Sequence, residues 1–252
     1  MSLPTFGFVA VHQAPLADGV ASEADWCAQV ATTGWATARL WRQAQALVVP
    51  KSYERRPRWA EACTASAAAG WPVQVRSSGG GLVPQGPGVW NLSLVWPTLV
   101  AMPTDTTAIY RALTDELRAA LARLGIDASA QAVQGSFCDG RFNLAAGGRK
   151  LVGTAQAWRR IEGRPVVLAH AVALVTADPA ALTAVANRFE AQSGGDARYD
   201  AEAITSVAQA WCAVHGEPAP PPDLEAQWLR VVAERLAHVL PPRERPPGDA
   251  LP

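Results

Sequence analysis

The chain has 252 residues, 49% of them hydrophobic, which suits one large domain, or one domain with a small appendage, and argues against wholesale disorder. Lysine plus arginine and aspartate plus glutamate number 22 each, so there is no overall basic field to hold nucleic acid. No apolar run approaches the roughly 20 residues of a membrane span, so we expect no membrane segment. The first residues lack the pattern of a secretory signal, and the cysteines form no CxxC pair. We therefore expect a cytoplasmic protein with reduced thiols and no metal site.

The first half of the chain predicts helices that alternate with short strands. Alanine-rich residues 19–34 and 58–70 predict helices that end at Gly34 and Gly70. A third helix is predicted over 104–125, where isoleucine and leucine recur at three- and four-residue spacing. Alternating or short apolar runs predict strands over residues 37–42, 46–50, 71–76 and 89–97. A basic, polar segment at 51–58 predicts a turn.

After the third helix the pattern changes to successive strands and then to helices. Strands joined by turns at 147–149 and 162–164 are predicted over residues 130–135, 142–146, 149–158 and 164–175. Helices are predicted over 179–192, over 201–215 with Asp200 as its N-cap, and over 224–239. This order of elements predicts an α+β fold, in which helices flank a mixed, largely antiparallel sheet.

The predicted strand at 89–97 has two chemically different faces. Asn91 and Ser93 alternate with Trp90 and Trp96, so the two pairs point to opposite sides of a sheet. These tryptophans could line an apolar pocket together with Trp158, although packing in the core is the ordinary role of such side chains.

A glycine-rich segment, RSSGGGLVPQG, occupies residues 76–86. Three consecutive glycines let the backbone approach a ligand and adopt positive φ, and successive N–H groups can cradle an anion or a carbonyl oxygen. The segment matches neither GxxxxGK[ST] nor a GxGxxG that opens a helix, which excludes a P-loop and disfavours a dinucleotide site. A flexible hairpin turn would explain a bare GGG equally well.

A second segment, GRKLVGTAQ at 148–156, contains Lys150 at the start of an apolar strand. A partly buried lysine needs a ligand anion or carbonyl as partner, and it could polarise a carbonyl or neutralise a phosphate. Gly153 would leave room for a ligand across the strand. The alternative is an edge-strand lysine that discourages strand pairing.

A third segment, FCDGRFNL at 137–144, precedes that strand. Cys138 adjoins Asp139 and is close in sequence to Arg141 and Lys150, so its thiolate could be stabilised by cations and act as a nucleophile. The alternative is a small buried cysteine. His170, in an apolar strand, has the pattern of a satisfied core histidine.

Together these segments resemble the lipoate–protein ligase and octanoyltransferase family, which shares its catalytic fold with biotin–protein ligases. The family patterns RRxxGGGxVxHDxGxxN and GRKxxGxAQ stand here as VRSSGGGLVPQGPGVWN and GRKLVGTAQ, and GRFNL, AHA (169–171) and TARLWRQAQALVVPKS (37–52) match further parts over roughly residues 35–176. The chain departs from the family where Val75 replaces an arginine, Gln85 and Gly86 replace a His-Asp pair, and Ala171 replaces a glycine.

The resemblance implies a biotin/lipoate protein ligase-like domain and roles for individual residues. Lys150 would contact the carboxyl or thioester oxygen of the acyl donor or bridge an acyl-adenylate, and Cys138 would carry the acyl-thioester that transferring members form. The implied substrate-binding residues are Arg76, Gly79, Gly80, Gly81, Arg141, Asn143, Gly153, Thr154, Ala155 and His170.

The resemblance leaves three functions open. The first is an acyltransferase that moves an octanoyl or lipoyl group to a lysine of a lipoyl-carrier domain, such as the H protein of glycine cleavage or the E2 of a 2-oxoacid dehydrogenase, without a tightly bound cofactor; acyl carrier protein is a further candidate partner. The second is a lipoate–protein ligase that uses ATP and magnesium to make lipoyl-AMP. The third is a non-catalytic paralogue that binds an acyl group or a protein.

On this basis we expect three regions in the chain. Residues 1–176 would form the acyl-binding catalytic domain, and residues 177–240 a helical extension packed on the same domain. Residues 241–252, rich in proline and charge, would be a disordered tail.

Overall fold

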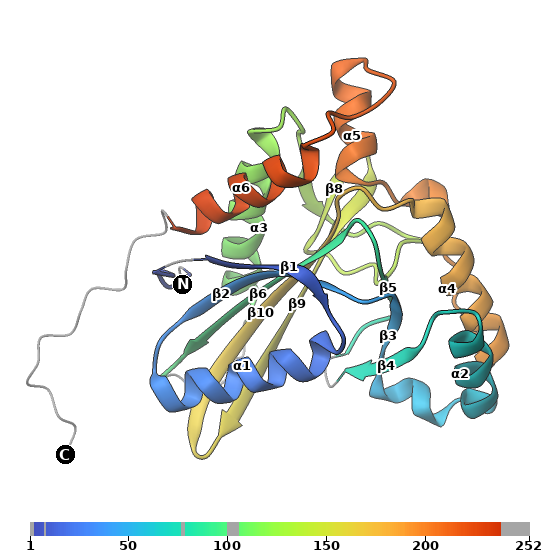
Figure 1. Cartoon of the computed structure of the whole chain (residues 1–252), viewed down its shortest axis with the longest axis horizontal. Coiled ribbons are helices and arrows are strands. Elements are labelled where there is room, and N and C mark those ends of the chain that lie inside the picture. Colours follow the sequence, from blue (N-terminus) through green and yellow to red (C-terminus); the bar gives the residue numbers. More distant parts are fainter. Residues whose placement is uncertain (1–2, 8, 77–78, 100–105, 238–252) are drawn as a thin grey trace, which may run out of the picture.

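The computed structural model describes residues 3–7, 9–76, 79–99 and 106–237, and it has the expected α+β architecture (Figure 1). The strands of the large sheet, in spatial order, are β1 (Val9–Leu16), β2 (Thr37–Gln43), β6 (Val89–Pro97), β10 (Arg164–Leu174), β9 (Arg149–Ile161), β8 (Asn143–Ala146) and β7 (Ser129–Gln131). All neighbouring pairs in this sheet are antiparallel except β1 and β2. The prediction of a mixed, largely antiparallel sheet is therefore confirmed.

A small sheet and the helices surround the large one. The small sheet has the order β4 (Val73–Arg76), β3 (Ala46–Pro50) and β5 (Val83–Gln85). The α-helices are α1 (Gly19–Thr33), α2 (Trp59–Ala68), α3 (Thr107–Ala122), α4 (Pro179–Ser193), α5 (Val207–His215) and α6 (Leu224–Ala237). Two short 3₁₀ helices are η1 (Lys51–Arg55) and η2 (Ala201–Ala203). No helix among the described residues is long and apolar enough to cross a membrane.

The two faces of the large sheet are covered by different helices (Figure 1). On one face, α3 and α6 pack in a cluster that includes Trp90, Trp96 and Trp228. On the other face, α1 packs with Trp41 and Leu168 in a separate cluster. Trp90 and Trp96 therefore fill the core, as does the partly buried Trp158 packed against it, and the idea that they line the pocket is wrong.

Local sequence signals explain where several elements begin and end. Asp18 caps α1 by accepting a hydrogen bond from the N–H of Ala21, and Gly34 ends the helix in the left-handed conformation. The hairpin between β8 and β9 turns at Gly147 and Gly148, which both have positive φ, as a two-residue turn of the mirror-image type requires.

The structure corrects the predicted helix over 201–215. Asp200 caps only η2, and a new helix, α5, begins after Ser206, whose hydroxyl accepts a hydrogen bond from the N–H of Gln209. The chain is extended at Ile204 because this segment pairs with β9: the N–H of Thr205 donates to the carbonyl of Lys150. The tertiary pairing therefore overrides local helix propensity.

Three smaller differences concern strands. Strand β7 ends at Gln131 rather than at residue 135, and β1 and β5 have no counterpart in the prediction. Strand β1 is half-exposed and β5 is three residues long with a central proline, so neither has a clear two-residue hydrophobic period. The predicted tail at 241–252, and the predicted helical ends at 104–105 and 238–239, lie outside the described residues.

Candidate functional site

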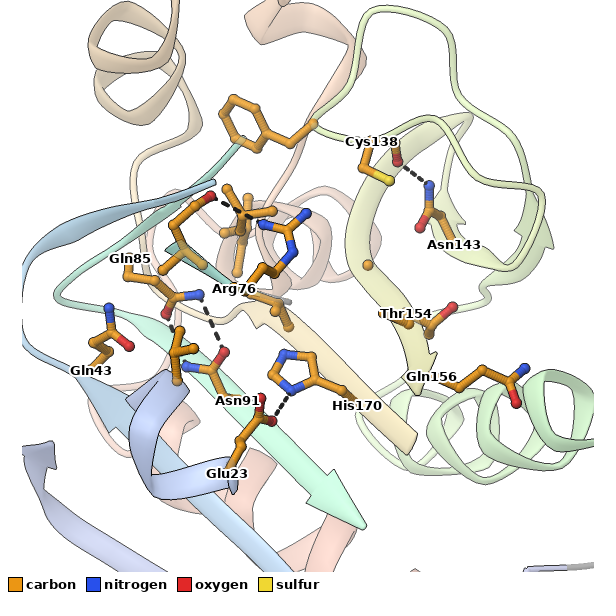
Figure 2. Close-up of a pocket in the computed structure, with 18 of the residues that line it drawn as sticks. Glu23, Gln43, Arg76, Gln85, Asn91, Cys138, Asn143, Thr154, Gln156 and His170 are labelled. Atoms are coloured by element: carbon orange, nitrogen blue, oxygen red, sulfur yellow. Dashed lines mark hydrogen bonds and ion pairs between the residues drawn. The ribbon is translucent and has the colours of Figure 1, made fainter. Parts of the chain in front are cut away.

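A cavity opens on the face of the large sheet that carries α1, between this sheet and the small one. Of the residues implied by the resemblance, it is lined by Arg76, Gly79, Cys138, Asn143, Lys150, Gly153, Thr154, Ala155 and His170. Figure 2 shows Cys138, Asn143 and Thr154 on one side, with Gln85 and Asn91 on the other. The triple-glycine segment and the lysine thus border one cavity, as predicted.

The floor of the cavity follows from strand register. On adjacent strands Asn91 pairs with Val172, and Val172 pairs with Gly153. Two residues away from Val172 on β10, and so on the same face of the sheet, His170 pairs with Ser93 on one side and with Ala155 on the other. The small residues of β9 leave a hollow, whereas the polar residues of β6 add hydrogen-bonding groups to an otherwise apolar floor.

Lys150 reaches this floor because of an irregularity in β9. The pairing of β8 with β9 shifts register beside Lys150, as in a β-bulge. Its side chain then lies along Gly153, where an added Cβ would stand 3.3 Å from both Cε and Nζ. Gly153 was expected to make room for a ligand; it lines the cavity, and it also makes room for the lysine itself.

The Lys150 amine is 7% exposed and holds the cysteine loop by its backbone. Its Nζ donates to the carbonyl oxygen of Phe137 and, at 2.7 Å, to that of Cys138. Burial lowers the pKa of Lys150 to about 8, and the charges of Cys138 and Asp139 oppose this fall. The amine therefore keeps its proton at neutral pH, but by a much smaller margin than an exposed lysine does.

Cys138 has a backbone conformation that non-glycine residues rarely adopt, with φ of 56°. Its carbonyl oxygen accepts from Lys150 and, at 2.6 Å, from Nδ2 of Asn143, which together hold the loop in this conformation. The thiol lies beneath the glycine segment, 3.1 Å from where a Cβ of Gly80 would be. Strain of this kind is typical of functional positions such as an exposed nucleophile.

Arg76 organises the glycine segment. Its guanidinium donates to the carbonyl oxygens of Val48, Gly79 and Gly81 at 3.1, 3.0 and 2.7 Å. Burial lowers the pKa of Arg76, and the charge of Cys138 is the strongest influence that raises it again. A thiolate at Cys138 would therefore interact favourably with both Arg76 and Lys150.

Three residues implied by the resemblance do not line the main cavity. Gly80 and Arg141 line a second, outer hollow, together with Tyr110 and Phe142, whose rings are stacked with centroids 4.7 Å apart. Gly81 lines neither hollow and lies against Tyr199 and the backbone of the cysteine loop. The outer hollow shares several residues with the main cavity: Gly79, Cys138, Asn143, Thr154, Ala155 and Gln156. The thiol is thus at the junction of the two.

A partly buried polar network on the cavity wall was missed from the sequence. Nδ1 of His170 and Oε1 of Glu23 are 2.5 Å apart, and Ser93 donates to the same carboxylate while accepting from Trp41. Burial raises the pKa of Glu23, but the charge and hydrogen bond of His170 and the hydrogen bond of Ser93 outweigh this, so its pKa lies below the ordinary value. The polar alternation in 89–97 was the available signal for Ser93; nothing local marked Glu23, which lies within an alanine-rich helix.

A second missed cluster lies behind the glycine segment and the cysteine loop. The carboxylate of Glu190, on α4, is fully buried and accepts hydrogen bonds from Tyr53 and Tyr199. It also pairs with Arg56 at 2.7 Å. Tyr53 and Glu190 are 137 positions apart in the chain, so no sequence spacing could have joined them.

Comparisons with known proteins agree with this geometry. The Lipoyl protein ligase A/B catalytic domain family matches residues 17–213. An uncharacterized protein of Cupriavidus necator is 45% identical over 193 residues, which cover 72% of this chain and 76% of that protein. An octanoyl-[GcvH]:protein N-octanoyltransferase of Kyrpidia tusciae is 40% identical over 144 residues, 55% of this chain and 49% of that protein, so the chain spans about half the length of this relative.

Among solved structures, that of a Thermoplasma acidophilum protein described as a lipoate protein ligase, with bound lipoic acid, has a TM-score of 0.63 to this chain. The two are 20% identical, and the match covers 92% of this chain and 86% of that one. At this identity the likeness shows a shared fold.

Proposed function

Because the chain belongs to the lipoyl protein ligase A/B catalytic domain family, we propose that it is an acyltransferase, which moves an octanoyl or lipoyl group to the ε-amine of a lysine on a lipoyl-carrier domain. The observation that carries the proposal is the position of the Cys138 thiol, which lies at the junction of two hollows, beneath the glycine segment, and interacts with the charges of Arg76 and Lys150. The relatives named octanoyl-[GcvH]:protein N-octanoyltransferase support the same reaction.

In the first half-reaction, the Cys138 thiolate attacks the acyl carbonyl carbon of the donor. A C–S bond forms, the bond from the carbonyl carbon to the leaving group breaks, and the oxyanion between these steps accepts a hydrogen bond from Lys150. An ammonium group has three N–H donors, and two of them hold the loop carbonyls, which leaves one for this oxygen. A thioester donor releases a thiolate; an amide donor, such as the octanoyl-[GcvH] of the relatives, releases an amine that needs a proton. Lys150, with its pKa of about 8, can supply that proton.

In the second half-reaction, the neutral amine of the acceptor lysine attacks the thioester carbon. The amide bond forms, the C–S bond breaks, and Cys138 leaves as a thiolate that is ready for another cycle. The proton that the attacking nitrogen loses returns to Lys150 where an amide donor has taken the lysine's proton, and passes to water where the donor is a thioester. The outer hollow gives both carriers one route to the sulfur, so donor and acceptor bind in turn. GcvH and E2-type lipoyl domains are the candidate carriers.

The acyl chain binds in the deep cavity. Its apolar lining includes Val48, Val83, Leu168, Val172 and Leu174. Each methylene group that leaves water contributes about 0.8 kcal/mol, so a chain of octanoyl length gains several kilocalories per mole.

The experiment is to detect the acyl-enzyme directly. The purified chain is incubated with an octanoyl or lipoyl thioester, and in parallel with octanoyl-GcvH, and its intact mass is measured with and without hydroxylamine. We expect one acyl group on Cys138, sensitive to hydroxylamine, which passes to an added apo-carrier. Cys138→Ala should abolish both the adduct and the transfer, whereas Cys63→Ala, at a free, half-buried thiol on α2 outside the cavity, should keep them.

Other outcomes would identify the remaining candidates. Undiminished transfer by Cys138→Ala would contradict the two-step mechanism. Lipoate-dependent release of pyrophosphate from ATP would instead indicate a ligase that proceeds through lipoyl-AMP. A chain that binds acyl groups but neither forms an adduct nor consumes ATP would be a non-catalytic paralogue.

A further inference from the structure

The buried cluster behind the site connects three separate segments of the chain. Tyr53 is on η1 and Glu190 is on α4, while Tyr199 belongs to the segment that follows α4. The hydroxyls of Tyr53 and Tyr199 donate to the same carboxylate oxygen of Glu190, at 2.5 Å and 3.2 Å respectively. Burial raises the pKa of both tyrosines, so both hydroxyls keep the protons they donate.

Each tyrosine also touches a loop of the site. The Tyr53 oxygen accepts a hydrogen bond of 3.2 Å from the backbone N–H of Leu82, which lies in the glycine segment directly after Gly81. The Tyr199 oxygen would be 3.4 Å from a Cβ at Gly81, and its ring packs edge-on against Phe137, the residue before Cys138. The two loops that enclose the thiol therefore share one support.

The carboxylate itself is fixed in place. Arg56 pairs with its second oxygen at 2.7 Å, and the guanidinium lies over the Tyr53 ring, 3.4 Å from its centroid. At Gly195 a Cβ would collide with both Glu190 and Arg56, so only glycine admits the pair there. An ion pair whose carboxylate is fully buried, with its arginine partly so, contributes little net stability compared with apolar residues of equal volume. A role in positioning therefore accounts for this pair better than a role in stability.

We propose that Glu190 is a positioning residue, which acts through Tyr53 and Tyr199 to hold the glycine segment and the Cys138 loop around the sulfur. The inference rests on the proposed function, because it is the acyl transfer at Cys138 that requires this geometry. It extends the functional part of the chain from the strands to α4, where the sequence carries no signal of a site. Precise placement matters here because small displacements of reacting groups reduce rates by large factors.

The test compares Tyr53→Phe, Glu190→Ala and Glu190→Gln with wild type. Tyr53→Phe removes the acceptor of the Leu82 N–H and one donor to Glu190 while preserving the ring. Glu190→Gln preserves an acceptor oxygen for the two hydroxyls, whereas Glu190→Ala removes it. The control is Val231→Ala, a truncation in α6 on the opposite face of the large sheet, which lowers stability without touching either loop.

Two readouts are measured on the full chain. The first is backbone hydrogen exchange in peptides that cover residues 79–85 and 137–142, which needs no acyl transfer. We expect faster exchange in Tyr53→Phe and Glu190→Ala but not in Val231→Ala. The second is the rate of Cys138 acylation at saturating acyl donor. We expect this rate to fall at least tenfold in Glu190→Ala, with less than about a twofold change in KM. In Glu190→Gln we expect most of the wild-type rate to be retained.

The outcomes separate this inference from the proposed function. If exchange in both loops is unchanged in Tyr53→Phe, or if Val231→Ala slows acylation as much as Glu190→Ala, the positioning role is refuted. If wild type forms no acyl-enzyme but the loops loosen as expected, the support is real and the proposed reaction is wrong. If Glu190→Ala does not fold, Tyr53→Phe and Glu190→Gln still give both readouts.

Discussion

Replacing Lys150 by methionine tests the claim that a nearly buried amine lies at the site. The chain has only two lysines, Lys51 and Lys150, so Lys51→Met, at an exposed position on η1, is a matched control. Methionine keeps the length of the side chain and removes the ionisable group. Because all other titrating groups are common to the wild type and the variants, the difference between their free energies of unfolding isolates the lysine.

The magnitude follows from the pKa. In the unfolded chain the ordinary lysine value of 10.5 applies, whereas burial lowers the folded value to about 8. Below pH 8 both states carry the proton, and the folded state bears the full cost of the buried charge, about 3 kcal/mol for this difference in pKa. Between pH 8 and 10.5 the unfolded state binds more protons than the folded state, so the contribution of Lys150 to stability rises with pH and is complete above 10.5.

Urea unfolding followed by tryptophan fluorescence at pH 7 and pH 10 gives the required free energies. We expect the stability of the wild type relative to Lys150→Met to rise by about 2 kcal/mol between these pH values. Relative to Lys51→Met it should not change. If the wild type and Lys150→Met vary in parallel with pH, the amine titrates like an exposed lysine, and the reasoning about the site fails.

Three further substitutions test the geometry around the thiol and one helix end. Gly80→Ala should lower stability by about 1–3 kcal/mol in urea unfolding and slow acylation of Cys138, because alanine fits poorly at a φ of 104° and its Cβ would crowd the sulfur. Gly7→Ala, at a glycine with open space around it and no positive φ, should do neither. Gly153→Ala should slow acylation several-fold with less than about 1 kcal/mol lost, because its Cβ displaces the amine of Lys150; an unaltered single-turnover rate would contradict this. Ser206→Ala should cost about 1 kcal/mol and lower Tm by about 2–4 °C in calorimetry without affecting acylation, since it removes only an N-cap.

The division of the site into a deep cavity and an outer hollow suggests how one thiol can serve two protein partners. In the proposed mechanism the cavity would hold the acyl chain throughout the reaction, while the hollow beside Arg141 and Phe142 would exchange one carrier for the other. Arg141 lies over the Phe142 ring at 4.8 Å and lines the outer hollow but not the main cavity, so in the proposed mechanism it would contact a carrier rather than the acyl chain.

Local patterns were sufficient to predict most elements, and they singled out the segments of Cys138 and Lys150 that the structure brings to the cavity. The period of hydrophobic residues in 107–122 predicted α3, the paired glycines 147 and 148 predicted a hairpin turn, and the segment around Lys150 marked the strand that carries the amine. Such signals are readable because caps, turns and amphipathic faces depend on residues only a few positions apart.

What the sequence by itself determined was therefore the α+β layout, the family resemblance, and the presence of a cysteine, a lysine and a glycine segment suited to acyl chemistry. Only the tertiary structure decided that Thr205 pairs with Lys150 and so interrupts a predicted helix, and that Glu190 meets Tyr53 and Tyr199 behind the cysteine loop. These features depend on backbone pairing and on buried charges between residues far apart in the chain, and such contacts leave no periodic pattern in the sequence.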